Sequence, residues 1–268
     1  MSDMMSEIAM ATASDAETRT PGTCFSDGPV LPEMVVVPAG KFWMGAVGDG
    51  DKFASVVEKP RHWVEIKHAF AVSRFPVTFE QWDAYAEGRE ELHSPDDRGW
   101  GRGKRPVVNV SWEDAQEYLD WLSMSAGRAY RLLSEAEWEY CCRAGASGVF
   151  STGNSISVKD ANFLYLDYGD RPGLGQPVPV GSYQPNGFGL FDMHGNVCEF
   201  VADSWHDNYA GAPGDGSAWG KHEATMWRVV RGGGWDALPR ILRCAFRDWV
   251  HHTKRMDNLG FRVACDLR

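Results

Sequence analysis

The feature that most limits the possible folds is a long stretch without regular periodicity, residues 146–226. It contains many Gly, Pro, Asn and Asp residues and only short apolar runs. A loop of that length is uncommon in a compact domain. The stretch is also rich in aromatic side chains, and the whole chain has 12 Trp and 29 Gly. Bulky rings and tight glycine turns predict a packed, irregular chain rather than disorder.

Three helices are predicted before this stretch. Thr78, Ser111 and Ser134 each precede an acid or amide by three residues, the pattern of a capping box at a helix N-terminus. The helix after Ser111 also has apolar residues at helical spacing, and Gly127 is expected to end it.

Short strands are predicted near both ends of the chain, over residues 34–45, 62–68, 227–231 and 260–264, from β-branched and alternating residues. Together with the helices they predict a single α+β domain. The domain is expected to cover residues 34–268. Residues 1–33 are small, polar and acidic, and are expected to form a flexible leader.

Charge and composition exclude several classes of function. The chain has 27 Lys and Arg against 37 Asp and Glu, a net charge of −10, which argues against nucleic-acid binding. It has no apolar run of about 18 residues, so no membrane span is expected. The N-terminus lacks the pattern of an export signal. Six cysteines without a Cys-x-x-Cys motif are not a disulfide scaffold, so we expect reduced thiols and a cytoplasmic location.

Seven motifs then occur in a characteristic order. They lie at residues 34–40 with 44–45, 75–78, 106–112, 130–140, 185–199, 231–235 and 260–262. In this order and spacing they resemble the formylglycine-generating enzyme (sulfatase-modifying factor) family over residues 34–265. The resemblance implies a C-type-lectin-like α+β fold with little regular secondary structure.

The resemblance leaves several functions open. The family includes copper-dependent formylglycine-generating oxidases and iron-dependent sulfoxide synthases of ergothioneine synthesis. It also includes maturation factors of siderophore pathways. A further group is non-catalytic and binds ligands, and it includes the variable proteins of diversity-generating retroelements.

The residues argue against the two described metal chemistries. The copper oxidases need two cysteines, five residues apart, just after the glycine motif, because Cu(I) prefers thiolates. Residues 234–242 contain no cysteine, and Cys244 resembles a structural position of the family, so no copper and no formylglycine generation are expected. The sulfoxide synthases take their histidine ligands largely from a preceding helical domain, whereas only residues 1–33 precede the match. The eight histidines form no ligand pattern. An iron or other metal-dependent oxidoreductase stays open as the alternative function.

The resemblance also implies structural calcium, since a hard cation prefers oxygen ligands. At the first site the carboxylates of Asp192 and Glu199 and the backbone carbonyls of Gly195 and Val197 would be ligands. At a second site the nearest matches are Asn162, Phe163 and Asp170. The alternative for both is an ordinary turn held by Asx hydrogen bonds.

Residues 232–262 are predicted to form the ligand-binding region. Family-like framework positions are Gly232, Gly233, Trp235, Pro239 and residues 242–247 and 259–262. The positions between them show neither helical nor strand periodicity and mix apolar with charged residues. They are Asp236, Ala237, Leu238, Arg240, Ile241, Asp248, Trp249, Val250, His251, His252, Thr253, Lys254, Arg255, Met256 and Asp257.

This alternation resembles the variable region of a retroelement-diversified protein with a lectin-type fold. Such a protein would display diversified residues on a rigid scaffold to an unknown protein or other macromolecular ligand. Trp249, His251, His252, Arg255 and Met256 are suited to contact it, because aromatic residues and Arg contribute much of interface energy. Two alternatives stay open: a binding module that is not diversified, and an enzyme with different chemistry. Arg231, Arg243, Arg247 and Arg262 are expected to brace the fold instead.

Overall fold

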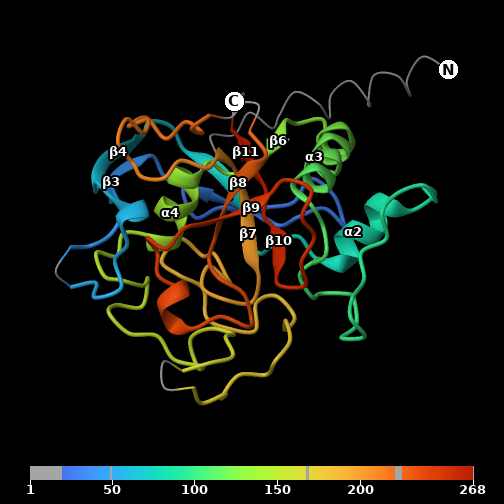
Figure 1. Ribbon diagram of the computed structural model, residues 1–268. Coiled ribbons are helices and arrows are strands. Elements are labelled where there is room, and N and C mark those ends of the chain that lie inside the picture. Colours follow the sequence, from blue (N-terminus) through green and yellow to red (C-terminus); the bar gives the residue numbers. More distant parts are fainter. Residues whose placement is uncertain (1–19, 49, 167–168, 221–224, 268) are drawn as a thin grey trace.

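The structure is a computed structural model that describes residues 20–48, 50–166, 169–220 and 225–267 (Figure 1). Three sheets and three α-helices make up its regular part, which confirms the predicted α+β class. The helices are α2 (Phe79–Ala86), α3 (Trp112–Ala126) and α4 (Glu135–Arg143). Each begins with the predicted capping box, at Thr78, Ser111 and Ser134, and Gly127 ends α3 with a positive φ of 64°.

A five-stranded sheet joins the two ends of the described chain. Its order is β1-β2-β5-β11-β6. The strands are β1 (Cys24–Phe25), β2 (Met34–Val37), β5 (Phe70–Ser73), β11 (Ala264–Asp266) and β6 (Tyr130–Arg131). Because β1 pairs with β2, the ordered domain begins before residue 34, the boundary predicted from the sequence. The part of the predicted leader before residue 20 lies outside the described residues.

A four-stranded sheet, β10-β7-β8-β9, carries the predicted ligand-binding region. Its strands are β10 (Leu259–Phe261), β7 (Cys198–Ser204), β8 (Trp227–Arg231) and β9 (Asp248–His251). β10 runs parallel to β7, and the other pairs are antiparallel. The remaining strands, β3 (Gly40–Met44) and β4 (His62–Ile66), form a hairpin.

The described part of the stretch without periodicity contributes an apolar cluster of its own, so it is packed there, as predicted. No helix or strand is assigned to its described residues between α4 and β7. Phe163 and Leu242 are both 0% exposed and form a separate apolar cluster with Val149, Phe150 and Ala161. Figure 1 shows this chain as long loops below the four-stranded sheet. β7 was not predicted, because six of its seven residues are buried and no apolar–polar alternation marks a strand covered on both faces.

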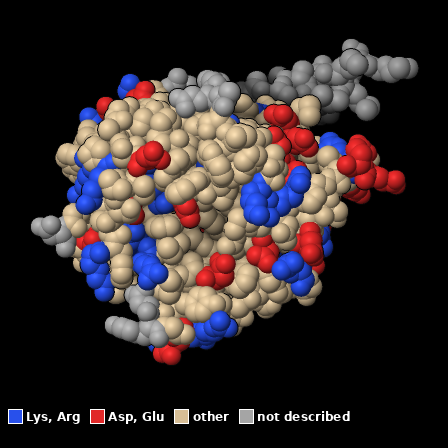
Figure 2. Space-filling view, viewed as in Figure 1, with Lys and Arg blue, Asp and Glu red and all other residues tan. Residues whose placement is uncertain are grey.

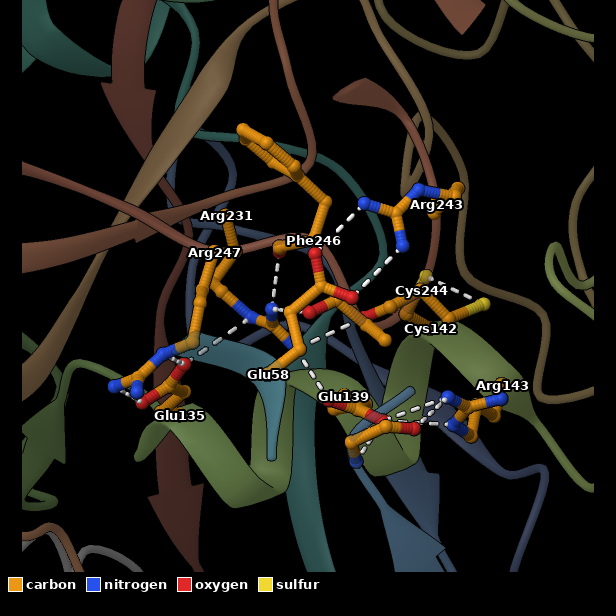
Figure 3. A network of polar contacts seen from close by, with 12 residues as sticks. Glu58, Glu135, Glu139, Cys142, Arg143, Arg231, Arg243, Cys244, Phe246 and Arg247 are labelled. Atoms are coloured by element: carbon orange, nitrogen blue, oxygen red, sulfur yellow. Dashed lines mark hydrogen bonds and ion pairs between the residues drawn. The ribbon is translucent and has the colours of Figure 1, made fainter. Parts of the chain in front are cut away.

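The four framework arginines brace the fold, as predicted. Arg231 is 2.5 Å from Glu139, and Arg247 is 2.7 Å from Glu135. Arg243 binds both Asp51 and Glu58, at 2.6 and 2.7 Å, and Arg262 binds Glu199 at 2.7 Å. All these side chains are at most 3% exposed. Figure 3 shows three of these arginines converging on acids of α4 and of the chain near Glu58. Removing one partner from such a pair strands a buried charge, so each of these arginines is expected to be important for stability.

Candidate functional site

The fifteen residues predicted to bind ligand are all partly or fully exposed. The framework segments between them have the opposite character. Residues 242–245 and 259–262 are buried, as are Gly232, Gly233 and Arg247. The division inferred from sequence therefore follows the division between interior and surface in large part, although the framework residues Trp235, Pro239 and Phe246 are partly exposed.

The first exposed segment, residues 236–241, contains the short 3₁₀ helix η2 (Pro239–Ile241). Ala237 and Ile241 pack against the Phe163 cluster, and the guanidinium of Arg240 lies 5.9 Å from the centre of the Phe53 ring. These contacts hold one side of η2 while the segment stays partly open to solvent.

The second exposed segment begins on β9 and carries an aromatic surface. Trp249 is 44% exposed and packs on Trp205 with a ring separation of 4.5 Å. Trp227, on the neighbouring β8, is also 44% exposed and meets His251 edge-on at 5.6 Å. We call Trp205, Trp227, Trp249 and His251 the tryptophan patch. Sequence reasoning missed Trp205 and Trp227, because only the pairing of β8 with β9 and the turn after β7 bring them to residues 248–257.

The loop from His252 to Asp257 returns over the N-terminus of α3. Arg255 donates two hydrogen bonds of 2.7 Å to Asp114, the acid of the α3 capping box. His252 Nδ1 lies 2.9 Å from Glu113. Burial by itself raises the pKa of Asp114, but hydrogen bonds from Arg255 and Ser111 outweigh it and lower the pKa overall. Arg255 is therefore anchored at one end although its side chain is 42% exposed.

The rest of this segment is divided between surface and interior. Val250 and Met256 pack on the main apolar core, whereas Thr253 and Lys254 are exposed. The Thr253 hydroxyl is 2.8 Å from His251 Nδ1. Only some members of the predicted set therefore present their side chains to solvent.

The two segments meet at one end. The Asn258 amide donates to both carboxylate oxygens of Asp236 at 3.0 Å, and the Trp235 indole donates to the carbonyl of Asp257 at 3.0 Å. Away from this junction the segments diverge, with Arg240 over Phe53 and Trp249 against Trp205. Figure 2 shows acidic side chains near the middle of this face and Lys and Arg on either side of them. Such mixed charge does not favour a polyanionic ligand.

Two of the seven predicted calcium ligands have an oxygen that fits a cation. Asp192 Oδ1 is buried without a hydrogen-bond partner, and so is Asn162 Oδ1. Burial raises the pKa of Asp192 to about 6, even though its other oxygen accepts a hydrogen bond from Gly181 N–H. Buried oxygens are rarely left unpaired, so an unseen ligand is a physical reason for them. Gly195 forms a β-bridge with Asn162, which places the two predicted sites next to each other.

The other predicted calcium ligands are less clearly available. Both oxygens of Glu199 accept hydrogen bonds of 2.7 Å from Arg262, and one also accepts from the Trp138 indole at 2.8 Å. Val197 and Phe163 are 0% exposed and would contribute only backbone carbonyls. Asp170 is exposed. Calcium stays a prediction that rests on Asp192 and Asn162.

Cys244 is not an isolated thiol. Its sulfur is 3.5 Å from the sulfur of Cys142 on α4, and Cys142 Sγ is 3.8 Å from both ring nitrogens of His194. Burial and the hydrogen bond to Cys244 raise the pKa of Cys142 well above its usual range. Burial alone would also raise the pKa of Cys244. Hydrogen bonds with Cys142 and His194 outweigh burial and hold this pKa well below the usual range. Sequence spacing does not reveal this cluster, because its members are about 50 residues apart.

The comparisons with known proteins agree with this architecture. Residues 23–267 match the Sulfatase-modifying factor enzyme 1-like domain family. PvdO from Pseudomonas aeruginosa is similar in structure, with a TM-score of 0.83 and 41% identity over 93% of this chain and 100% of that one. The Treponema denticola variable protein 1 has a TM-score of 0.70 and 25% identity over 91% of this chain and 98% of that one. The Formylglycine-generating enzyme of Bos taurus is 33% identical over 75% of this chain and 54% of its own length.

The fold is thus of the C-type-lectin-like α+β class, as predicted. The chain belongs to the Sulfatase-modifying factor enzyme 1-like family. It spans between 38% and 54% of the length of several curated relatives, including the bovine enzyme. Proteins named as enzymes and a protein named as variable share this fold. No helix within the described ranges is long and apolar enough to cross a membrane.

Proposed function

We propose that this chain is a non-catalytic ligand-binding protein that displays residues 236–241 and 248–257 on a rigid lectin-type scaffold. The observation that carries the proposal is the match between residue type and burial in residues 232–262. Framework arginines lie inside in ion pairs, whereas the residues without periodicity are partly or fully exposed, and six of them (Arg240, Asp248, Trp249, Thr253, Lys254 and Arg255) are fully so. A surface built this way tolerates change without loss of the fold, because substitutions at exposed positions usually alter stability by less than about 0.5 kcal/mol.

The finer proposal is that the segment is the variable region of a diversity-generating retroelement. The likeness to the Treponema denticola variable protein 1 supports it, at 25% identity and with nearly complete coverage of that protein. The ligand would be a protein or another macromolecule. The tryptophan patch suits such a ligand, because large rings contribute contact area with little loss of conformational entropy.

Sequencing the codons of residues 226–268 across a population of the host tests diversification. We expect changes confined to residues 236–241 and 248–257, with residues 243–247 unchanged. An invariant segment would remove the retroelement proposal. The next hypothesis to test would then be a binding module that is not diversified.

A multiple substitution tests the scaffold without knowledge of the ligand. Replacing the exposed residues Arg240, Asp248, Trp249, Thr253 and Lys254 together by Asn should lower the melting temperature by only a few degrees. The matched control is Arg243→Met, which leaves Asp51 and Glu58 buried without their cation and should cost about 3–5 kcal/mol. If the five-fold variant unfolds like the control, the display surface is part of the core and the proposal fails.

Calcium is proposed as a structural ion of the scaffold. Asp192 would supply a side-chain oxygen at the first site and Asn162 one at the second, and ions there would tie the irregular chain together. Titration of the chelated protein with Ca²⁺ should show binding that Asp192→Asn weakens. Absence of any calcium-dependent heat or stabilisation would exclude the site.

The second candidate function is a metal-dependent oxidoreductase, favoured by relatives that are named as enzymes, such as the bovine Formylglycine-generating enzyme. Residues 234–242 lack the cysteines of the copper site that the resemblance implies, so we expect no conversion of a cysteine-containing sulfatase peptide. Conversion with oxygen consumption, together with a stoichiometric redox metal, would establish this function and overturn the non-catalytic proposal.

A further inference from the structure

A shallow apolar hollow lies next to the β3–β4 hairpin. Its volume is about 600 Å³, and its apolar lining comes from Ala46 and Val47 after β3, Val56 of the 3₁₀ helix η1 (Val56–Glu58), Pro60 before β4, and Ala210 after β7. Figure 1 shows the connection between β3 and β4 at the left side of the molecule, whereas β9 lies near its centre. None of the residues that line the hollow belongs to the exposed segments 236–241 and 248–257.

The shape and the lining of the hollow are those of a site for a small ligand. Such sites are concave, mostly apolar and about 300–1,000 Å³ in volume, with a few polar groups that orient the ligand. Val56 contributes an apolar side chain that is 71% exposed. A ligand that covers Val56 would remove apolar surface from water, which is a favourable contribution to binding.

Buried contacts hold the walls of the hollow in place. Glu58, at the end of η1, is 0% exposed and is bound by Arg243 at 2.7 Å (Figure 3). The backbone N–H of Tyr209 donates to the carbonyl oxygen of Lys59 at 2.7 Å. A Cβ at Gly45 would lie 2.6 Å from the carbonyl oxygen of Glu58, so glycine lets the chain after β3 pass this close to η1. The hollow is therefore formed before a ligand arrives, which lowers the cost of binding.

Two cations, Lys59 and Arg61, line the hollow beside its apolar surface. Both are exposed, and in the described part of the chain neither side chain forms an ion pair or a hydrogen bond with an acid. The described lining contains no Asp or Glu. Glu139 acts on Arg61 through its charge, but it is already bound to two buried arginines. Burial and the nearby charge of Arg143 lower the pKa of Arg61, so an anion next to this guanidinium would be favourable.

We propose that this hollow binds a free amphiphile with an apolar tail and one carboxylate, the class of a medium-chain fatty acid. The tail would lie on Val47, Val56 and Pro60, and the carboxylate would lie near Lys59 and Arg61. A concave site with two cations, on a chain with a net charge of −10, suits one small anion better than an anionic membrane surface. The inference is independent of what residues 236–257 bind, since its test uses the amphiphile alone.

An NMR titration of the full chain with decanoate tests the proposal. We expect saturable binding at a single site, with a Kd of about 1 mM or below. Octanoate should bind about 4- to 15-fold more weakly, because each fully buried methylene contributes about fourfold in affinity. Decyltrimethylammonium has the same tail with the opposite charge and should bind at least about tenfold more weakly than decanoate.

Variants of the two cations locate the carboxylate. Lys59→Gln and Arg61→Gln should each weaken decanoate binding by about 2- to 5-fold, because ion pairs at exposed positions are modest in energy. Lys52→Gln is the matched control, because Lys52 is an exposed cation of the same β3–β4 connection but does not line the hollow. It should keep the wild-type Kd.

A variant of the apolar lining locates the tail. Val56→Ser should weaken decanoate binding by about 3- to 10-fold without unfolding the chain, since Val56 is 71% exposed. Val30→Ser, at an exposed valine outside the hollow, should have no effect. The proposal is overturned if decanoate does not saturate, if decyltrimethylammonium binds equally well, or if the control variants lose as much affinity as the others. Binding to phosphatidylglycerol vesicles that requires Lys59 and Arg61, without single-site binding of decanoate, would overturn it in favour of a membrane surface.

Discussion

The Arg262–Glu199 ion pair allows a quantitative test of how much the buried ion pairs contribute to stability. Both side chains are 0% exposed, and both carboxylate oxygens accept hydrogen bonds of 2.7 Å. Arg262 also donates to the carbonyls of Ser73 and Phe191. Burial of either charge without the other is costly, because the interior cannot replace the lost hydration.

Three variants separate the stranded charge from the lost contacts. Arg262→Met leaves the Glu199 carboxylate buried alone, and Glu199→Gln leaves the guanidinium alone, so each should cost about 3–5 kcal/mol. The double variant strands neither charge and loses only hydrogen bonds and some packing. We therefore expect it to be more stable than the sum of the single costs predicts, by about 3 kcal/mol.

Urea unfolding at pH 7 measures the four free energies of the cycle. The exposed pair Lys41–Glu65, with side chains 52% and 43% exposed, is the control and should show a coupling below about 1 kcal/mol. The reasoning is refuted if each single variant at the buried pair costs less than about 1.5 kcal/mol. Strict additivity in the double variant would refute it equally, because the ion pair would then carry no stranded-charge penalty.

Three further predictions follow from burial and charge. Arg255→Ala should cost about 1 kcal/mol at pH 7, because its ion pair is partly exposed. Since the folded chain lowers the pKa of Asp114, that stabilisation exists above the unfolded pKa and is lost as the pH falls through the folded one, so denaturation curves of variant and wild type should converge in acid. Trp249→Ala should lower the melting temperature by no more than about 3 °C, whereas Trp138→Ala, at a residue with 0% exposure, should lower it by about 10 °C. Calcium at about 100 times its Kd should stabilise the chelated protein by about 2.7 kcal/mol, read from denaturant midpoints, and an equal response in Asp192→Asn would contradict the assigned ligand.

Local signals in the sequence were enough for the helices, and the family resemblance was enough for the framework. Capping boxes are formed by neighbouring residues, so Thr78, Ser111 and Ser134 marked the helix starts correctly. The buried arginines could be separated from the exposed residues of the same segment because the family resemblance marked the framework positions.

What the sequence could not provide depends on contacts between distant residues. The Cys142–His194–Cys244 cluster joins three segments whose spacing matches no ligand motif. The tryptophan patch needs the pairing of β8 with β9 before Trp227 can be placed beside His251. The ion pair between Glu199 and Arg262 could not be predicted either, because the sequence around a carboxylate in a calcium-like loop does not indicate which distant residue it contacts.

The position of β11 has a consequence for synthesis. This strand lies between β5 and β6, in the interior of the five-stranded sheet, although it is made last of all the strands described. The sheet therefore cannot close until the ribosome has translated residues 232–262 in the correct reading frame. A stop codon or frameshift in the exposed segments deletes β11 and also Arg262, so such chains cannot complete the fold. Only chains that retain the correct reading frame would fold and escape proteolysis, so folding would select against truncating changes in residues 236–241 and 248–257.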